Sequence, residues 1–237
     1  MNIKECYNFV VYGDSISKGI VYDDSVGRYV VLKDNFANIV GDRLKCVIYN
    51  MGKFGNNIVR GQRKIDVDVI KKNPDIVLIE FGGNDCDLDW QAVAENPKVD
   101  HAPKTDLSVF ENTLDNIIAY FRKLNIIPVL MTLPPLDSDR YFRWVCKNDL
   151  NAEKSVLTYL GDIKRIFSWQ EQYSKKIEEA ARKNNIEIID VREAFLMQGD
   201  YSKYLCIDGI HPNKDGHMLI ADKILDYINQ NYRFLLK

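Results

Sequence analysis

The sequence predicts an α/β protein, a three-layer α/β/α sandwich around a mostly parallel central sheet. Short apolar runs alternate along the chain with longer segments whose apolar residues recur at helical spacing. The strongest run, Asp75 to Phe81, is apolar after Asp75 apart from Glu80, as expected of a parallel strand that is covered on both faces. Strands and helices that alternate in this way favour parallel strands joined by right-handed crossovers.

The N-terminal half supplies the first strands and helices of this sandwich. Residues Asn8 to Tyr12 are mostly β-branched or aromatic, which predicts a buried strand, and Gly13 then lets the backbone turn sharply. The polar segment from Lys18 to Arg28 has no regular pattern, and we expect a loop there. The next expected elements are a helix at Asp34 to Leu44, a strand at Cys46 to Tyr49, a helix from Ile58 up to Asn73, ended by Pro74, and the strand at Asp75 to Phe81.

Two segments interrupt the alternation after the central strand, the first polar with two prolines and the second rich in aromatic residues. We expect residues 87–106 and 137–167 to form excursions at the top of the sheet rather than domain boundaries. The remaining expected elements are a helix at Phe110 to Leu124, a strand at Ile126 to Leu133, a helix at Trp169 to Arg182, a strand at Ile186 to Val191 and a closing helix from about Asp215 to Asn229. Pro212 is expected to open the closing helix.

Length and composition predict one globular domain, residues 1–237, with a substantial core. The formal net charge is -2 and no basic stripe stands out, so we exclude a nucleic-acid partner. Residues 1–6 lack the apolar segment of a secretory leader, and no apolar run is long enough to span a membrane. We therefore expect a cytoplasmic protein with no membrane association. The five scattered cysteines predict neither a disulfide framework nor a zinc site.

A serine stands directly after the first predicted strand, in Gly13-Asp14-Ser15. The carboxyl edge of an open α/β sheet is where such folds place their ligands, so Ser15 is a candidate nucleophile. It could equally cap a helix. Near the other end of the chain, Asp208 precedes His211 by three residues in a loop marked by glycine and proline. This spacing lets the carboxylate turn back onto the imidazole, so that Ser15, His211 and Asp208 match the roles of nucleophile, base and orienting acid.

Two further strand ends carry candidates for an oxyanion hole. A glycine backbone N–H and an asparagine amide can donate to the oxyanion that develops during acyl transfer. Asn84 follows Gly-Gly after the central strand, while Gly52 and Gly55 both follow the strand at Cys46 to Tyr49. Asp85 and Asp87 come next, but carboxylates after a glycine turn are common turn residues, and we predict no metal.

These four stretches resemble the SGNH family, also called the GDSL esterases and lipases. The family's four named positions and its triad acid fall on Ser15, Gly55, Asn84, His211 and Asp208. The family places its donor glycine five residues after an asparagine, here Asn50, which selects Gly55 over Gly52. The motifs span nearly the whole chain in the family's order, and Ile16 replaces the commoner leucine after Gly-Asp-Ser. The resemblance implies an SGNH-hydrolase, flavodoxin-like fold.

The function that we predict is a serine esterase that works through an acyl-enzyme and needs no cofactor. The oxyanion hole would consist of the Ser15 N–H, the Gly55 N–H and the Asn84 amide. We expect a short-chain O-acyl ester, such as an acetyl ester, of a small soluble or carbohydrate substrate. Tyr141 and Trp144 of the second excursion are candidate substrate-binding residues, although such aromatic residues could merely pack the excursion against the sheet.

Three alternatives stay open at this point. Thioesterase or lysophospholipase action on longer acyl chains could use the same residues. A fold of this kind could also be a non-catalytic module that binds sugars or acyl groups. The chain could further assemble as a homo-oligomer.

Overall fold

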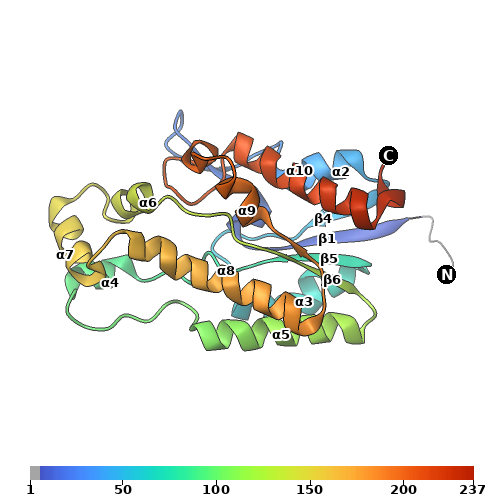
Figure 1. Cartoon of the computed structure of the whole chain (residues 1–237), viewed down its shortest axis with the longest axis horizontal. Coiled ribbons are helices and arrows are strands. Elements are labelled where there is room, and N and C mark those ends of the chain that lie inside the picture. The colour runs from blue at the N-terminus through green and yellow to red at the C-terminus, as the bar shows by residue number, and fades with distance from the viewer. Residues whose placement is uncertain (1–5) are drawn as a thin grey trace.

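The structure is a computed structural model that describes residues 6–237. Residues 1–5, on which the expectation of no leader largely rests, lie outside the described residues. Within the described part, five parallel strands form one sheet in the order β4-β1-β5-β6-β7 (Figure 1). The strands are β1 (Tyr7–Gly13), β4 (Cys46–Asn50), β5 (Ile76–Glu80), β6 (Ile127–Met131) and β7 (Ile188–Ile189). This is the strand order of flavodoxin-like sheets, and the predicted fold class is confirmed.

Helices cover both faces of the sheet, which makes the three layers visible in Figure 1. One layer consists of α3 (Ile58–Asp68), α5 (Leu107–Lys123) and α8 (Lys164–Asn184). The opposite layer consists of α2 (Phe36–Arg43), α9 (Val191–Leu196) and α10 (Lys214–Asn231). The chain also forms short helical elements, which are α1 (Ser15–Lys18) and the 3-10 helices η1 (Ile70–Lys72), η2 (Tyr201–Tyr204) and η3 (Arg233–Leu235).

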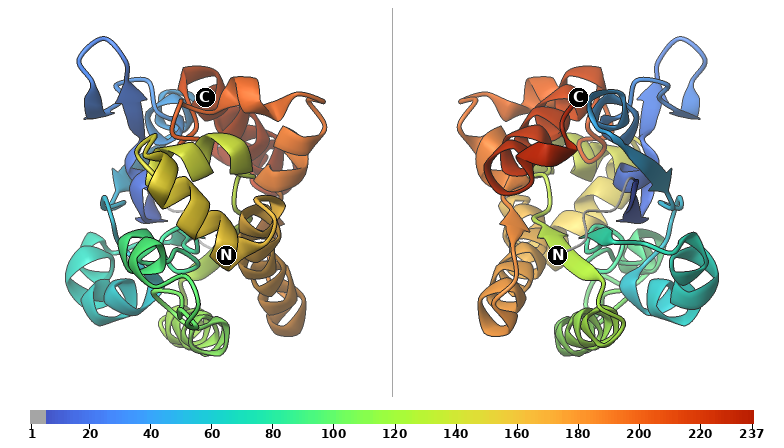
Figure 2. Two further views of the ribbon diagram at one scale, coloured as in Figure 1. Left: turned by 90° about the vertical axis from the view of Figure 1, so that its left-hand side faces the viewer. Right: turned by 90° about the vertical axis from the view of Figure 1, so that its right-hand side faces the viewer.

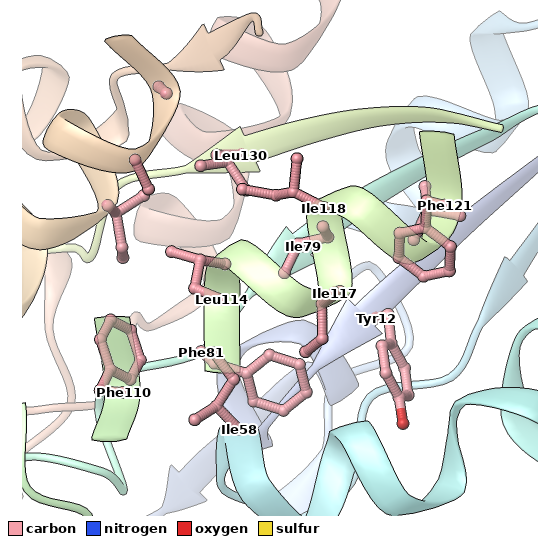
Figure 3. Close-up of a cluster of buried hydrophobic side chains, with 14 of the residues drawn as sticks. Tyr12, Ile58, Ile79, Phe81, Phe110, Leu114, Ile117, Ile118, Phe121 and Leu130 are labelled. Carbon is pink, nitrogen blue, oxygen red and sulfur yellow. The ribbon is translucent and has the colours of Figure 1, made fainter. Parts of the chain in front are cut away.

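Two hydrophobic cores lie on the two faces of the sheet, because successive strand residues point in opposite directions. In β1, Val10 and Tyr12 pack with α3, α5 and α8, whereas Phe9 and Val11 pack with α2, α9 and α10. Figure 3 shows the first core, in which side chains of α5 lie over the strands. With a full core on each face, the central strands are held firmly, and so are the residues at their ends.

A third, smaller core lies beyond the carboxyl edge of the sheet. We call residues 87–106 and 137–167 together the cap. It contains α4 (Trp90–Glu95), α6 (Ser138–Val145) and α7 (Leu150–Leu160) and runs into the start of α8. These elements share a buried cluster with Val93, Phe142 and Val156. The left view of Figure 2 looks onto α6 and α7 in front of the sheet layers.

The structure corrects several expectations about secondary structure. The segment expected to be a loop contains an antiparallel hairpin, β2 (Ile20–Asp23) and β3 (Arg28–Val31), which projects from the sheet layers in Figure 2. Of the two excursions, the second is largely helical, whereas the first contains only the short helix α4. The last strand is only two residues long, because the chain enters α9 at Val191. The closing helix begins at Lys214, capped by the Asn213 side chain, so Pro212 precedes the cap instead of opening the helix.

No helix within residues 6–237 combines the length and the apolar composition needed to cross a membrane. The predicted localisation, the predicted absence of membrane and nucleic-acid partners and the possible homo-oligomer are not tested by the fold and stay predictions.

Candidate active site

Ser15 is presented where β1 ends, at the start of the short helix α1. The Asp14 side chain caps this helix by accepting the Ile16 N–H at 2.9 Å. A Cβ atom at Gly13 would lie 2.1 Å from the Glu80 carbonyl oxygen of β5, so only glycine fits between the two strands here. The turn therefore holds Ser15 in a largely buried position, with 7% of its surface exposed.

The structure brings Ser15, His211 and Asp208 together as one hydrogen-bonded chain. The His211 Nδ1 lies 2.6 Å from Asp208 Oδ2, and its Nε2 lies 2.9 Å from Ser15 Oγ. An ionised carboxylate can only accept, so Nδ1 carries the proton and Nε2 is free to accept the Ser15 hydroxyl proton. This is the arrangement that a serine nucleophile and its base require.

The loop that carries His211 is fixed from both sides. The Cys206 N–H donates to the His211 carbonyl at 2.8 Å, and the Asp137 N–H donates to the Gly209 carbonyl at 2.8 Å. Gly209 has a φ of 76°, and a Cβ atom there would lie 2.7 Å from the Asp137 carbonyl oxygen. Glycine is needed at this position both for its backbone conformation and for the close approach to the cap.

Asp208 accepts four hydrogen bonds, one of them from a residue that the sequence analysis missed. Its Oδ1 accepts the N–H groups of Ile210 and His211 at 3.0 and 3.1 Å. Its Oδ2 accepts His211 Nδ1 and the hydroxyl of Tyr29 at 3.1 Å. Burial favours the neutral acid, but the hydrogen bonds and the charge of His211 outweigh it and hold the pKa of Asp208 below its ordinary value.

Tyr29 lies on β3, within the hairpin, and its ring also packs against the imidazole of His211 at 5.1 Å between centroids. Burial and the Asp208 carboxylate raise the pKa of the Tyr29 phenol, so its hydroxyl stays a donor. No local pattern could have identified it, because 179 residues separate it from Asp208 in the chain.

Asn84 and Gly55 both line the cavity in front of Ser15, as an oxyanion hole requires. One Asn84 amide hydrogen is directed to Asp14 Oδ2 at 3.2 Å, which orients the amide and leaves its second N–H for a ligand. Gly55 has a φ of 69° with open space beside it. Gly52 instead donates its N–H to Asn50 Oδ1 and packs against Ser17 and Lys18. The geometry favours Gly55 over Gly52, although its catalytic role stays a prediction.

Buried carboxyl groups lie directly behind the candidate site. Burial and the nearby Glu80 raise the pKa of Asp14 well above its ordinary value. Burial likewise raises the pKa of Glu80, whose Oε2 accepts the Ser17 hydroxyl at 2.8 Å. Asp85 accepts the Ile58 N–H at the start of α3, and burial raises its pKa to about 7. These groups join the ends of β1 and β5 to α1 and α3, which fixes the loops that present Ser15 and Asn84.

A cavity of about 380 Å³ lies between these residues and the cap. Both predicted substrate-binding residues line it. Trp144 is half-buried and packs against Tyr22, with ring centroids 4.7 Å apart. Tyr141 is buried, and its hydroxyl donates to Asp87 at 2.6 Å, so this hydroxyl is already engaged within the protein. Contact of either residue with substrate stays a prediction.

Residues 6–237 hold no cluster of three or more histidine, cysteine or carboxylate side chains that could bind a metal ion. What the described site does hold is a serine hydrogen-bonded to an imidazole, with Asn84 and Gly55 in the wall of the same cavity. Such an arrangement is suited to nucleophilic attack on an acyl carbon.

Comparison with a protein-family model gives a match over residues 11–219, to the GDSL-like lipase/acylhydrolase family. Two curated plant proteins are similar in sequence. The GDSL esterase/lipase CPRD49 of Arabidopsis thaliana is 22% identical over 192 residues, which cover 78% of this chain and 68% of that protein. The GDSL esterase/lipase WDL1 of Oryza sativa subsp. japonica is 23% identical over 190 residues, which cover 78% of this chain and 66% of that protein.

Solved structures share the fold over nearly the whole chain. A lipase/acylhydrolase from Enterococcus faecalis superposes with a TM-score of 0.71 at 20% identity, over 98% of this chain and 97% of that one. A catalytic mutant of Axe2, an acetylxylan esterase from Geobacillus stearothermophilus, gives a TM-score of 0.67 at 21% identity, over 96% of both chains.

Proposed function

Since the chain belongs to the GDSL-like lipase/acylhydrolase family and is a carboxylic ester hydrolase of that family, we propose that Ser15 is its nucleophile and that hydrolysis passes through an acyl-enzyme. The observation that carries this proposal is the hydrogen-bonded chain from Ser15 Oγ through His211 to Asp208. A buried serine hydroxyl within 2.9 Å of an oriented imidazole is ready to lose its proton to that base.

The proposed reaction has two halves. In the first, Ser15 Oγ attacks the ester carbonyl carbon while His211 Nε2 takes its proton. The oxyanion accepts hydrogen bonds from the Ser15 N–H, the Gly55 N–H and the Asn84 amide. His211 then returns the proton to the leaving alcohol oxygen, and the acyl-enzyme remains. In the second half, His211 takes a proton from water, whose oxygen attacks the acyl carbon. His211 then returns this proton to Ser15 Oγ as the bond between the acyl carbon and Oγ breaks, and the acid and free Ser15 are released.

The proposed substrate is a short-chain O-acyl ester, such as an acetyl ester, of a small soluble molecule or carbohydrate. Flat aromatic side chains supply much of the cavity wall, and the apolar faces of sugar rings pack well on such surfaces. These aromatic wall residues are Tyr29, Phe54, Trp90, Tyr141, Trp144, Tyr159 and Trp169. The similarity to a protein described as an acetylxylan esterase supports the same substrate class.

A second candidate is action on longer acyl chains, as in a thioesterase or lysophospholipase. It is favoured by the aliphatic part of the same cavity wall, which includes Leu88, Leu136, Leu160 and Ile166. The two candidates differ in which part of the substrate fills the cavity. In the first it is the alcohol, and in the second it is the acyl chain.

A fluorophosphonate probe tests the nucleophile. The wild type should be labelled on Ser15, and Ser15→Ala should abolish both labelling and ester turnover while its thermal midpoint stays nearly unchanged. Ser25→Ala is a matched control, because Ser25 lies exposed in the hairpin turn, where its side chain donates to Asp23. An unlabelled but folded wild type that turns over no ester would favour the non-catalytic binding module.

The substrate class is tested by kcat/KM across p-nitrophenyl esters from acetyl to palmitoyl and across acetylated sugars, acyl-CoA and lysophospholipid. Preference for acetyl esters and acetylated sugars supports the proposal. A rise toward palmitoyl would select the second candidate and leave Ser15 as the nucleophile.

A further inference from the structure

In the cavity between the sheet edge and the cap, several acceptor side chains are paired within the protein, whereas several donor side chains are not. Its carboxylates and the Gln170 side chain are already hydrogen-bonded within the protein. Asp87 Oδ1 accepts the Tyr141 hydroxyl at 2.6 Å and the Trp90 indole N–H at 2.7 Å, and its Oδ2 is paired with Lys104 at 2.6 Å. The charge of the Asp87 carboxylate is thus offset where it lines the cavity.

Gln170 is occupied in the same way. Its Nε2 donates to the Pro134 carbonyl at 2.8 Å, and its Oε1 accepts from Arg192 at 2.8 Å. Asp14, the other carboxyl in the wall, accepts from Ile16 and Asn84. Gln170 and Asp14 therefore already accept hydrogen bonds within the protein.

Three residues that line the cavity carry donor groups with no protein acceptor among residues 6–237. The indole N–H of Trp169 is buried and has no hydrogen-bond partner there. Lys147, just after α6, and Arg165, in the first turn of α8, are exposed side chains that form no ion pair in the part of the chain that the structure describes, although Arg165 lies over the Tyr159 ring at 5.9 Å. Indole, ammonium and guanidinium groups donate hydrogen bonds and cannot accept them. A ligand that pairs with these groups would bring acceptors and negative charge.

These donors belong to the cap side of the cavity, whereas Ser15 lies at the sheet edge. A substrate that reaches both must carry its ester at one end and an anionic group at the other. An arginine and a lysine in the wall of one cavity suit a carboxylate or a phosphate group. A cavity of about 380 Å³ has room for a sugar ring between the two ends.

Resting on the proposed function, we infer that the natural substrate is an O-acylated sugar that also carries a carboxylate or phosphate group, bound by Arg165, Lys147 and the Trp169 N–H. The aromatic walls hold the ring, and the two cations on the cap select the anionic group. The cap thereby discriminates between esters that Ser15 would otherwise attack alike.

The test compares three probes that bear the same acetyl group: O-acetylated methyl glucoside, methyl glucuronide and methyl glucoside 6-phosphate. At low ionic strength, kcat/KM for one or both anionic probes should exceed that for the neutral probe by about tenfold, and whichever probe is preferred identifies the anion. Raising the ionic strength from about 0.01 M to about 1 M shortens the Debye length from about 30 Å to about 3 Å and should reduce this advantage.

Arg165→Gln and Lys147→Gln should each lower the anionic-to-neutral ratio of kcat/KM by about twofold to fivefold, as expected of a partly exposed ion pair. Trp169→Phe, which keeps an aromatic ring but removes the N–H, should lower the same ratio. Lys164→Gln is the matched control, because Lys164 is an exposed cation next to Arg165 that does not line the cavity, and the ratio should stay unchanged.

An anionic-to-neutral ratio of one or less, or a ratio that responds equally to the Lys164 control and to Arg165→Gln, would overturn the inference. Ser15→Ala separates this failure from failure of the proposed function. If Ser15→Ala abolishes turnover of the neutral probe while the wild type shows no anionic preference, only the inference about the anionic substrate is wrong. If Ser15→Ala hydrolyses all three probes at the wild-type rate, the proposed function fails as well.

Discussion

The sheet edge and the cap face each other across one cavity, but they are built differently. At the sheet edge, Ser15 and Asn84 follow strands that are buried on both faces, and the groups behind them are bonded to one another. The cap has its own small core, and its Lys147 and Arg165 line the cavity without an ion pair in the described residues. From this difference we expect the sheet edge to fix the geometry of the reaction and the cap to determine which ester is bound.

The contrast predicts that a change at the sheet edge lowers turnover of every ester. Asn84→Ala removes one preorganised oxyanion donor and should lower kcat by about 10²-fold to 10³-fold with little change in KM. The amide makes a single 3.2 Å hydrogen bond, to Asp14, so the thermal midpoint should fall only slightly. Steady-state kinetics on p-nitrophenyl acetate and an acetylated sugar check both points. An unchanged kcat would remove Asn84 from the reaction.

The helix layer behind the sheet contains a buried ionisable residue, His217 of α10. Its protonation should affect the stability of the fold rather than the selectivity set by the cap. Burial lowers the pKa of His217 to about 4, whereas histidine in an unfolded chain titrates at about 6.5. Between these values only the unfolded state takes up the proton. The free energy of unfolding should therefore fall by about 2–3 kcal/mol as the pH drops from about 6.5 to about 4.

Urea unfolding of the wild type and of His217→Asn across this pH range isolates the effect. The asparagine oxygen can stand in for Nδ1, which accepts the Phe36 N–H at 3.5 Å. Asp85, whose raised pKa of about 7 acts in the opposite direction, is common to both proteins and cancels in the difference. Equal pH slopes in the two proteins would contradict the assignment to His217.

A change in the cap should alter selectivity instead of overall chemistry. Trp144→Ala removes an aromatic face from the cavity wall and should lower kcat/KM for an acetylated sugar relative to p-nitrophenyl acetate by about tenfold. Trp144→Phe should give an intermediate ratio, because part of the stacking surface remains. If the ratio stays at the wild-type value in both variants, Trp144 only packs the cap against the hairpin.

Tyr29 tests whether the hairpin belongs with the sheet edge or with the cap. Tyr29→Phe keeps the ring against His211 but removes the hydrogen bond to Asp208, and kcat should fall by about threefold to tenfold on all esters with KM unchanged. With one donor fewer, the Asp208 carboxylate should attract the imidazolium form more strongly. The acidic limb of the pH–rate profile should then move to higher pH.

Tyr22→Phe is the control for this variant, since Tyr22 lies on the same hairpin with its ring 5.3 Å from that of Tyr29. It should leave the pH profile in place. A loss of selectivity without a shift in the pH profile in Tyr29→Phe would group the hairpin with the cap.

The sequence by itself determined the sheet and the positions around its edge. Apolar runs such as Ile76 to Glu80 need two covered faces, and that requirement leads to parallel strands with helices on both sides. The carboxyl ends of parallel strands share one edge, so Ser15, Gly55 and Asn84 were expected to converge there, and they line one cavity. The hydrogen bond between Asp208 and His211 was likewise predictable from their spacing, because a separation of three residues lets the chain turn back and bring the two side chains together.

Only the tertiary structure decided the hairpin, the form of the cap and the role of Tyr29. The strands of the hairpin, Ile-Val-Tyr-Asp and Arg-Tyr-Val-Val, are rich in β-forming residues but only four residues long. Their place beside the site depends on contacts of Tyr22 and Tyr29 with Trp144, far along the chain. The cap helices bury their apolar residues against one another rather than against the sheet, so their pattern alone could not place them. The hydrogen bond from Tyr29 to Asp208 joins residues whose separation in sequence carries no local signal, and folding alone brings them within reach.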